Sequence, residues 1–263
     1  MEVDAYLRRI GYRGGRAPTT ETLSRLHRAH LCAVPFENLD IPLGEPIVLS
    51  PPAFYDKVVR RRRGGFCYEL NGLFAWLLEE LGFEVSMLSA RVFDGADAGP
   101  DFDHLVLLVE SDERLIADVG FGDSFLEPLP LDRKADVMQR DWSYRLSSRE
   151  DDIVLEEKCD GSWEPQYAFT PQKRRLAEFA PMCAYQQTSP ESVFTQKTIC
   201  SRATATGRAT LTHARLVVTD GAHREEVEVA SELEYRDLLR RHFAIDLGEG
   251  ARVDRLMRSV GAG

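Results

Sequence analysis

A cysteine stands just behind a glycine pair in the segment RRRRGGFCYELNGLF, where Cys67 opens a strongly apolar stretch. If that stretch is a helix, its first turn offers unpaired N–H groups and the positive end of the helix dipole, which lower a thiol pKa. The same N–H groups would also stabilise an oxyanion. The position therefore favours a nucleophilic thiolate at Cys67, and the alternative is a buried cysteine that acts as a small hydrophobe.

A cysteine nucleophile works with a histidine base that a third group orients, and His104 has a candidate partner in Asp118. The segments HLVLLVE and RLIADVGF flank a polar break at Asp112 and predict an antiparallel hairpin. The residue numbers of two cross-strand partners have a constant sum along such a hairpin, about 224 for one centred on Asp112. The numbers of His104 and Asp118 add to 222. We expect the two side chains on one face, nearly opposite each other. The alternative is a histidine with other partners beside a surface aspartate.

Helices are expected to precede this hairpin and to position the cysteine. The predicted helices span residues 3–10, 20–34, 51–63 and 70–81. Ser50 followed by Pro51 predicts the start of the third, as an N-cap with proline at the first helical position. In the fourth, leucine and phenylalanine recur at helical spacing up to Gly82, which predicts a buried helix.

After Gly82 the apolar period changes to that of β-strands. The predicted strands span residues 83–93, 104–110, 114–121, 142–148, 152–158 and 163–169. A hairpin turn is expected at residues 159–162, where Asp160 and Gly161 supply turn chemistry.

The last third of the chain predicts a smaller mixed lobe. Residues 171–201 show no clear periodicity and are expected to connect two lobes, whereas strand patterns at 209–219 and 225–230 flank a turn at Asp220. Ser231 and Glu234 form a capping box before a final helix. The predicted units are a helical domain over 1–83, a β domain over 84–188, a connecting segment over 189–202 and an α/β lobe over 203–263.

Composition narrows the class of protein. The 263 residues carry 33 basic and 43 acidic side chains, and this net charge of −10 argues against nucleic-acid binding. The richest apolar run, residues 70–78, is shorter than the ~20 residues of a membrane span. No secretory leader is visible, and the five cysteines form no disulfide framework. We therefore expect a cytoplasmic protein.

Two histidines and a run of arginines have no predicted part in the chemistry. His27 and His30 share a helical face, but no third ligand at a familiar spacing completes a metal site, so we expect no metal. The basic run at residues 60–63 is expected to be a solvated helix end, unless one arginine pairs inward with Glu37.

Three motifs, RGGFCYELNGLF, PFENLDIPLG and ADVGFG, resemble in this order the arylamine N-acetyltransferase family. The resemblance covers nearly the whole chain and weakens after residue 194. It implies an α+β, papain-like cysteine-transferase fold with a helical N-terminal domain, a central β-barrel domain and a C-terminal α/β lid. It also makes Cys67 similar to the acyl-accepting cysteine of the family, His104 to its base and Asp118 to the orienting aspartate.

The resemblance further implies where the substrates bind. Three aromatic side chains correspond to positions that line the acceptor pocket, namely Phe36, Phe121 and Phe194. Gly122 in the VGFG turn and Asp103 fall in the region that meets coenzyme A. Two positions depart from the common pattern of the family: Asp103 replaces a frequent threonine, which affects the expected coenzyme A contacts, and Leu70 replaces a frequent histidine.

The implied reaction is a ping-pong acyl transfer with acetyl-CoA as donor and without a metal or prosthetic group. A Cys67 thiolate, paired with the His104 imidazolium, would take the acetyl group as a thioester and pass it to an arylamine, arylhydrazine or hydroxylamine. Three other functions stay open: an amide synthase of the same family that closes a polyketide chain on an internal arylamine, a cysteine peptidase or transglutaminase-like hydrolase, and a non-catalytic binding module. The oligomeric state is also left open.

Overall fold

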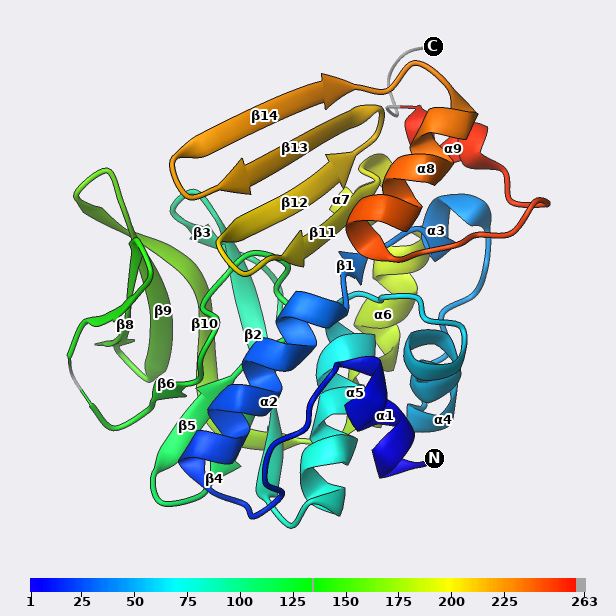
Figure 1. Ribbon diagram of the computed structural model, residues 1–263. Coiled ribbons are helices and arrows are strands. Elements are labelled where there is room, and N and C mark those ends of the chain that lie inside the picture. The colour runs from blue at the N-terminus through cyan, green and yellow to red at the C-terminus, as the bar shows by residue number, and fades with distance from the viewer. Residues whose placement is uncertain (134, 259–263) are drawn as a thin grey trace.

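In the computed structural model, which describes residues 1–133 and 135–258, a helical part and two β-sheets lie side by side (Figure 1). The helices are α1 (Val3–Arg9), α2 (Thr20–Ala33), α3 (Asp40–Leu43), α4 (Pro51–Tyr55), α5 (Cys67–Glu80), α6 (Ala180–Thr188), α7 (Val193–Gln196), α8 (Glu232–Phe243) and α9 (Val253–Met257), with a π-helical turn η1 (Asp56–Arg60) and a 3-10 turn η2 (Leu176–Phe179). The side chains of Ser50 and Ser231 cap α4 and α8 as predicted, and the side chain of Thr19 caps α2.

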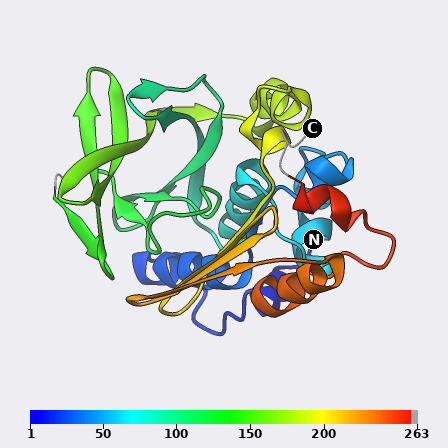
Figure 2. The same ribbon diagram turned by 90° about the horizontal axis from the view of Figure 1, so that it is seen from above.

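A nine-stranded antiparallel sheet forms the central part of the molecule. Its strands are β2 (Glu84–Asp94), β3 (Asp97–Ala98), β4 (His104–Glu110), β5 (Arg114–Ala117), β6 (Leu129–Pro130), β7 (Val137–Gln139), β8 (Trp142–Arg149), β9 (Asp152–Cys159) and β10 (Ser162–Arg174). Eight of them follow the order β6-β5-β4-β2-β10-β9-β8-β7, and the short β3 pairs with β2 outside this order. Figure 2 shows how strongly this sheet curves. Asp160 and Gly161 both have positive φ, as a two-residue hairpin turn requires.

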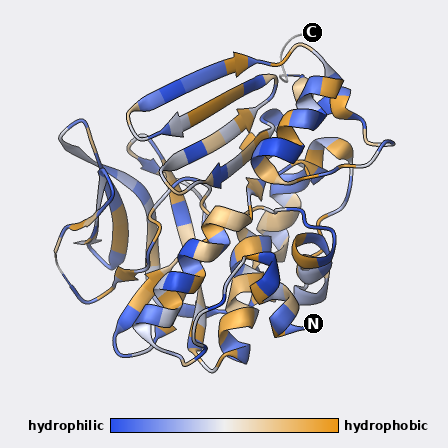
Figure 3. Cartoon of the chain, in the orientation of Figure 1, coloured by the Kyte–Doolittle hydropathy of each residue, from blue (hydrophilic) through white to orange (hydrophobic). Residues whose placement is uncertain are grey.

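A five-stranded sheet forms the second β layer. It combines β1 (Phe36–Glu37), β11 (Ile199–Ala203), β12 (Gly207–Thr212), β13 (Arg215–Asp220) and β14 (His223–Glu228), in the order β1-β11-β12-β13-β14. The edge strand β14 is mostly hydrophilic (Figure 3), which suits a strand that faces solvent on one side. The predicted strand 209–219 is two strands, because His213 has φ 48° and turns the chain.

Residues 171–201, which are predicted to connect two lobes, contain regular elements that their sequence pattern does not indicate. β10 runs on to Arg174, and η2, α6, α7 and β11 follow. Pro181 lies in the first turn of α6, where a proline costs no helical hydrogen bond, so it does not break this helix. Phe179 and Cys183 from this stretch are buried in the core around α5.

Three hydrophobic clusters hold the parts together. The largest surrounds α5 and includes the inner faces of β4 and β5, the second lies between the five-stranded sheet and α8, and the third fills the concave side of the nine-stranded sheet. The predicted α+β class is confirmed, whereas the domain boundaries at 83, 188 and 202 stay predictions. Within the described residues no helix is long and apolar enough to cross a membrane.

Candidate active site

The start of helix α5 is set by the glycine pair before it. A Cβ on Gly64 would lie 2.0 Å from the carbonyl oxygen of Pro35, and the Glu37 N–H donates to the Gly65 carbonyl over 2.8 Å. The two glycines therefore let the RGGFC segment run directly against the PFEN segment. This fixes Cys67 at the first position of α5, with 3% of its surface exposed.

The predicted hairpin brings His104 and Asp118 together. Leu107 pairs with Ala117 across β4 and β5, and these indices add to the expected 224. His104 Nε2 lies 2.7 Å from Asp118 Oδ2, and because a carboxylate only accepts, Nε2 donates. Nδ1 is then the ring nitrogen left for a proton from the cavity side.

Strand β5 ends at Ala117, four residues before the end of the predicted strand, because side chains take the next backbone N–H groups. The Asp118 N–H donates to His27 Nε2 over 3.0 Å, and the Val119 N–H donates to Asn71 Oδ1 over 2.8 Å. These two side chains replace a strand partner and turn the chain so that the Asp118 carboxylate faces His104.

Asn71 and His27 both bind Asp118, and neither contact was predicted from the sequence. Asn71 lies one turn after Cys67 on α5 and donates to Asp118 Oδ1 over 2.8 Å and to the Leu105 carbonyl over 2.6 Å. His27 donates from Nδ1 to the Leu126 carbonyl, so its Nε2 is free to accept, and burial lowers its pKa to about 4. Two features of the sequence could have indicated these contacts: Asn71 is a polar residue four positions after Cys67, and His27 lies on the inward face of α2.

The electrostatics of the triad are set by burial and by hydrogen bonds. Burial alone would raise the pKa of Asp118, but the charge of His104 and hydrogen bonds from His104, Asn71 and Gly120 hold it below its ordinary value. Burial raises the pKa of the Cys67 thiol, and a backbone hydrogen bond from Leu105 opposes this only in part. Desolvation thus opposes the thiolate that the helix dipole favours, and His104 is the candidate acceptor for the Cys67 proton.

Cys67 and His104 line one cavity of about 400 Å³ with mostly apolar walls. The three predicted aromatic residues, Phe36, Phe121 and Phe194, all line it, and so does Asp103. The ring of Phe121 lies 5.3 Å from that of His104. Gly122 lies instead in an adjoining cavity that shares Phe36 and Phe121 with the first.

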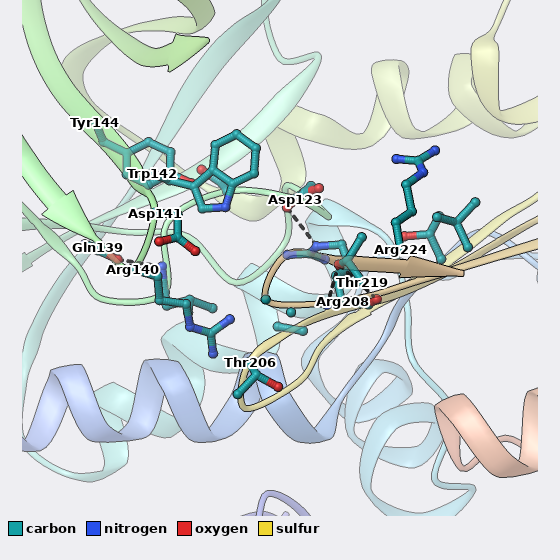
Figure 4. Close-up of a pocket in the computed structure, with 17 residues that line it drawn as sticks. Asp123, Gln139, Arg140, Asp141, Trp142, Tyr144, Thr206, Arg208, Thr219 and Arg224 are labelled. Carbon is teal, nitrogen blue, oxygen red and sulfur yellow. Dashed lines mark hydrogen bonds and ion pairs between the residues drawn. The ribbon is translucent and has the colours of Figure 1, made fainter. Parts of the chain in front are cut away.

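A third cavity, of about 420 Å³, lies between the two β-sheets (Figure 4). Trp142 reaches into it from β8, and Arg208 and Arg224 reach it from β12 and β14. Arg208 also bonds to Asp123 at 2.7 Å and to the Gly122 carbonyl, and thereby ties β12 to the VGFG turn.

Behind the first turn of α5 lies a buried ion cluster, which we define as Glu37, Asp40, Lys57, Arg63 and Glu69. Each of these residues is at most 7% exposed. Arg63 binds Glu37 at 3.0 Å and Asp40 at 2.7 Å, and Lys57 binds Asp40 at 2.7 Å and Glu69 at 3.0 Å. The expected inward pair with Glu37 is confirmed, and its arginine is Arg63.

The two helical histidines make separate contacts. His30 Nδ1 is hydrogen-bonded to the Tyr6 hydroxyl at 2.8 Å, whereas His27 binds the Asp118 backbone. Across the described ranges 1–133 and 135–258, no group of three or more histidine, cysteine, aspartate or glutamate side chains has the arrangement of a metal site.

Comparison with known proteins agrees with this geometry. A family model described as N-acetyltransferase matches residues 19–252. The arylamine N-acetyltransferase of Mycolicibacterium smegmatis is 38% identical, over 97% of this chain and 95% of its own length. Human arylamine N-acetyltransferase 1 is 37% identical, over 94% of this chain and 95% of its own length. The chain belongs to the arylamine N-acetyltransferase family. It is therefore an enzyme of the transferase class.

Solved structures of the arylamine N-acetyltransferase family confirm the predicted fold. The structure of the enzyme from M. tuberculosis superposes with a TM-score of 0.91 at 34% identity and covers 98% of this chain and 100% of that chain. The structure of the Mycobacterium marinum enzyme in complex with CoA superposes with a TM-score of 0.88 at 31% identity and covers 97% of both chains.

Proposed function

We propose that this protein transfers the acetyl group of acetyl-CoA to arylamines, arylhydrazines or arylhydroxylamines through a thioester on Cys67. One observation carries the proposal: Cys67 and His104 line the same apolar cavity, with His104 held by a fully buried Asp118. Membership of the family supports the same reaction.

In the first half-reaction, the Cys67 thiol gives its proton to Nδ1 of His104 as the sulfur attacks the thioester carbonyl. Asp118 accepts the Nε2–H bond and stabilises the imidazolium, which offsets the cost of forming a thiolate in a buried site. The tetrahedral intermediate expels coenzyme A as a thiolate, and this thiolate takes the proton from His104. The acetyl group stays on Cys67.

In the second half-reaction, the acceptor nitrogen attacks the Cys67 thioester while His104 removes its proton. The Cys67 thiolate then leaves and is protonated by His104, so the enzyme returns to its starting form. Phe36, Phe121 and Phe194 provide flat apolar walls, which suit an aromatic amine better than an aliphatic one.

The donor needs a path from the surface to Cys67, and the chain of cavities supplies a candidate. The cavity at Gly122 shares Phe36 and Phe121 with the Cys67 cavity, and shares Asp123 and Trp142 with the cavity between the sheets. The pantetheine arm would run past Gly122, and the arginines of the last cavity would bind phosphate groups. A CoA complex is recorded for the M. marinum relative.

The remaining expectations belong to this proposal: a small-molecule acceptor, a cytoplasmic location, and neither a metal nor a prosthetic group. The relatives are named arylamine N-acetyltransferases, so the polyketide amide synthase is not favoured. A hydrolase would pass the acyl group of Cys67 to water and not to an amine. A binding module would form no acetyl-enzyme.

The test is intact-protein mass spectrometry after incubation with acetyl-CoA, and again after an arylamine is added. The wild-type chain should gain one acetyl group and lose it to the amine, whereas Cys67→Ala should gain none. Cys183→Ala is the matched control, because Cys183 is equally buried but does not line the cavity. An acetyl group that persists in Cys67→Ala, or its absence from the wild type, would refute the proposal.

A further inference from the structure

A carboxylate lies inside the otherwise apolar cavity that holds Cys67. Asp103 directly precedes His104, is half-buried, and lines the cavity together with Cys67 and the aromatic residues. Its charge is close enough to the sulfur to oppose ionisation of the Cys67 thiol. The triad as described makes no use of this carboxylate.

The Asp103 side chain is held in place by a chain of hydrogen bonds. Gln186 Nε2 donates to Asp103 Oδ1 over 2.7 Å, and the Ser192 hydroxyl donates to Gln186 Oε1 over 2.6 Å. These two partners come from α6 and from the residue that caps α7. The carboxylate is therefore fixed from outside its own loop.

The backbone at Asp103 is fixed as well. The Tyr68 hydroxyl, from the residue after Cys67, lies 2.7 Å from the Phe102 carbonyl and 3.1 Å from that of Asp103. Phe102 has φ 65°, a strained conformation for a residue with a side chain. Strain held by several contacts beside a reactive site indicates that the orientation of Asp103 matters for function.

Other charges near the cavity are better screened than Asp103. Glu191 and Lys197 also line it, but both are exposed and have opposite signs. Asp118 does not line the cavity, and its carboxylate is bound by His104, Asn71 and the Gly120 N–H. Burial raises the pKa of Asp103, while the His104 charge and hydrogen bonds from the Val92 backbone and Gln186 favour its carboxylate form and oppose this rise.

We propose that Asp103 sets the charge preference of the acceptor pocket, so that neutral and cationic aromatic amines are accepted and anionic ones, such as aminobenzoates, are rejected. An anionic substituent that enters this cavity must leave water and approach a fixed carboxylate, whereas a cation gains a partner. This inference rests on the proposed acetyl transfer and specifies its acceptor class.

The test uses three acceptors of one shape and three charges: 4-aminobenzoate, 4-aminobenzamide and 4-aminobenzamidine. For each, kcat/KM for acetyl transfer is measured with wild-type protein and with Asp103→Asn, which keeps an oxygen for Gln186. Asn should raise the ratio of carboxylate to amide by about tenfold and lower the ratio of amidine to amide. The three amines differ in intrinsic reactivity, and comparing each ratio between variant and wild type removes this difference.

Asp101→Asn is the matched control, since it removes the same charge from the same loop at a side chain that is 77% exposed. It should leave the ratios within about twofold, because solvent screens an exposed charge. Asp103→Thr provides a second neutral variant if asparagine disturbs His104. Ratios that neither neutral variant shifts would overturn the inference while acetyl transfer itself still stands. If no acceptor is acetylated at all, the proposed function fails instead.

Discussion

Two buried groups of charged side chains meet at the first turn of helix α5. On one side His104 and Asp118 stand beside Cys67, and on the other Glu69 joins the buried ion cluster. The exposed fractions of the two groups are alike, at 1–3% for the first and 0–7% for the second. Burial therefore does not tell which of them performs chemistry.

The two groups differ in what their charges face. In the ion cluster, each of the three carboxylates contacts Lys57 or Arg63, so the charges largely compensate one another. In the triad, Cys67 and His104 line a cavity, and only one ring nitrogen of His104 is taken by Asp118. A buried titratable group marks a candidate site where a cavity reaches it and a proton position is left open.

The largest expected effect follows from changing the triad without changing its volume. In Asp118→Asn, the oxygen can still accept from Asn71 and Gly120, but the new amide nitrogen faces His104 Nε2. Nε2 must then accept, which places the imidazole proton on Nδ1, where it can no longer take the proton of Cys67. We expect the rate of Cys67 acetylation to fall by roughly 10³–10⁴-fold.

This rate is measured by quenched-flow mass spectrometry, with thermal unfolding as the check on folding. A variant that unfolds like the wild type and acetylates at the wild-type rate would show that Asp118 does not assist His104. The proposed difference between this group and the buried ion cluster would then fail as well.

The second expected effect is on stability. Lys57→Met keeps the length of the side chain but leaves Asp40 and Glu69 without their 2.7 Å and 3.0 Å partner. An uncompensated buried carboxylate is strongly destabilising, so we expect the free energy of unfolding to fall by about 3–5 kcal/mol. Urea unfolding at neutral pH measures this.

Arg60→Met is the control, because Arg60 is 69% exposed and its ion pair, with an Asp56 that is 45% exposed, is long at 3.8 Å. Its effect should stay below about 1 kcal/mol. Equal losses in the two variants would show that the cluster is no more coupled than a surface pair. The folded fraction of Lys57→Met should still acetylate Cys67.

The triad was more predictable than its supports. The pairing of His104 and Asp118 follows from the index sum of a local hairpin, and Leu107↔Ala117 has that sum. His27 reaches Asp118 across 91 residues of sequence, and it binds a backbone group, which has no residue-type signature. Such a contact depends on how α2 packs, and no periodicity in the sequence reports that.

The ion cluster was predictable only in part for the same reason. The sequence shows four consecutive arginines at residues 60–63 and Glu37 in the PFEN motif, but only the packed chain decides that Arg63 is the one that turns inward. Gly64 is a similar case. A side chain at this position would place its Cβ 2.0 Å from the Pro35 carbonyl oxygen, and the sequence does not show that these two segments are neighbours.

The smallest expected effect is a pH dependence that separates the two groups. Burial is the main cause that raises the pKa of Glu69 to about 7, with Glu37 and Asp40 adding to it and Lys57 opposing. In the unfolded chain the ordinary value of 4.5 applies, so the folded state holds the proton more tightly. The stability from this proton is complete below the ordinary range and is lost as the pH rises to about 7.

Glu69→Gln carries no such proton, so the difference in unfolding free energy between variant and wild type should move in favour of the variant between pH 5 and 7, by an amount on the order of 1 kcal/mol or more. Glu21→Gln, at an exposed position in the first turn of α2, should show no such trend. The measurement is urea unfolding across this range. If this difference in unfolding free energy does not change with pH, the cations of the buried ion cluster compensate the charge of Glu69 fully. The cluster would then differ from the triad even more than the pKa of Glu69 indicates.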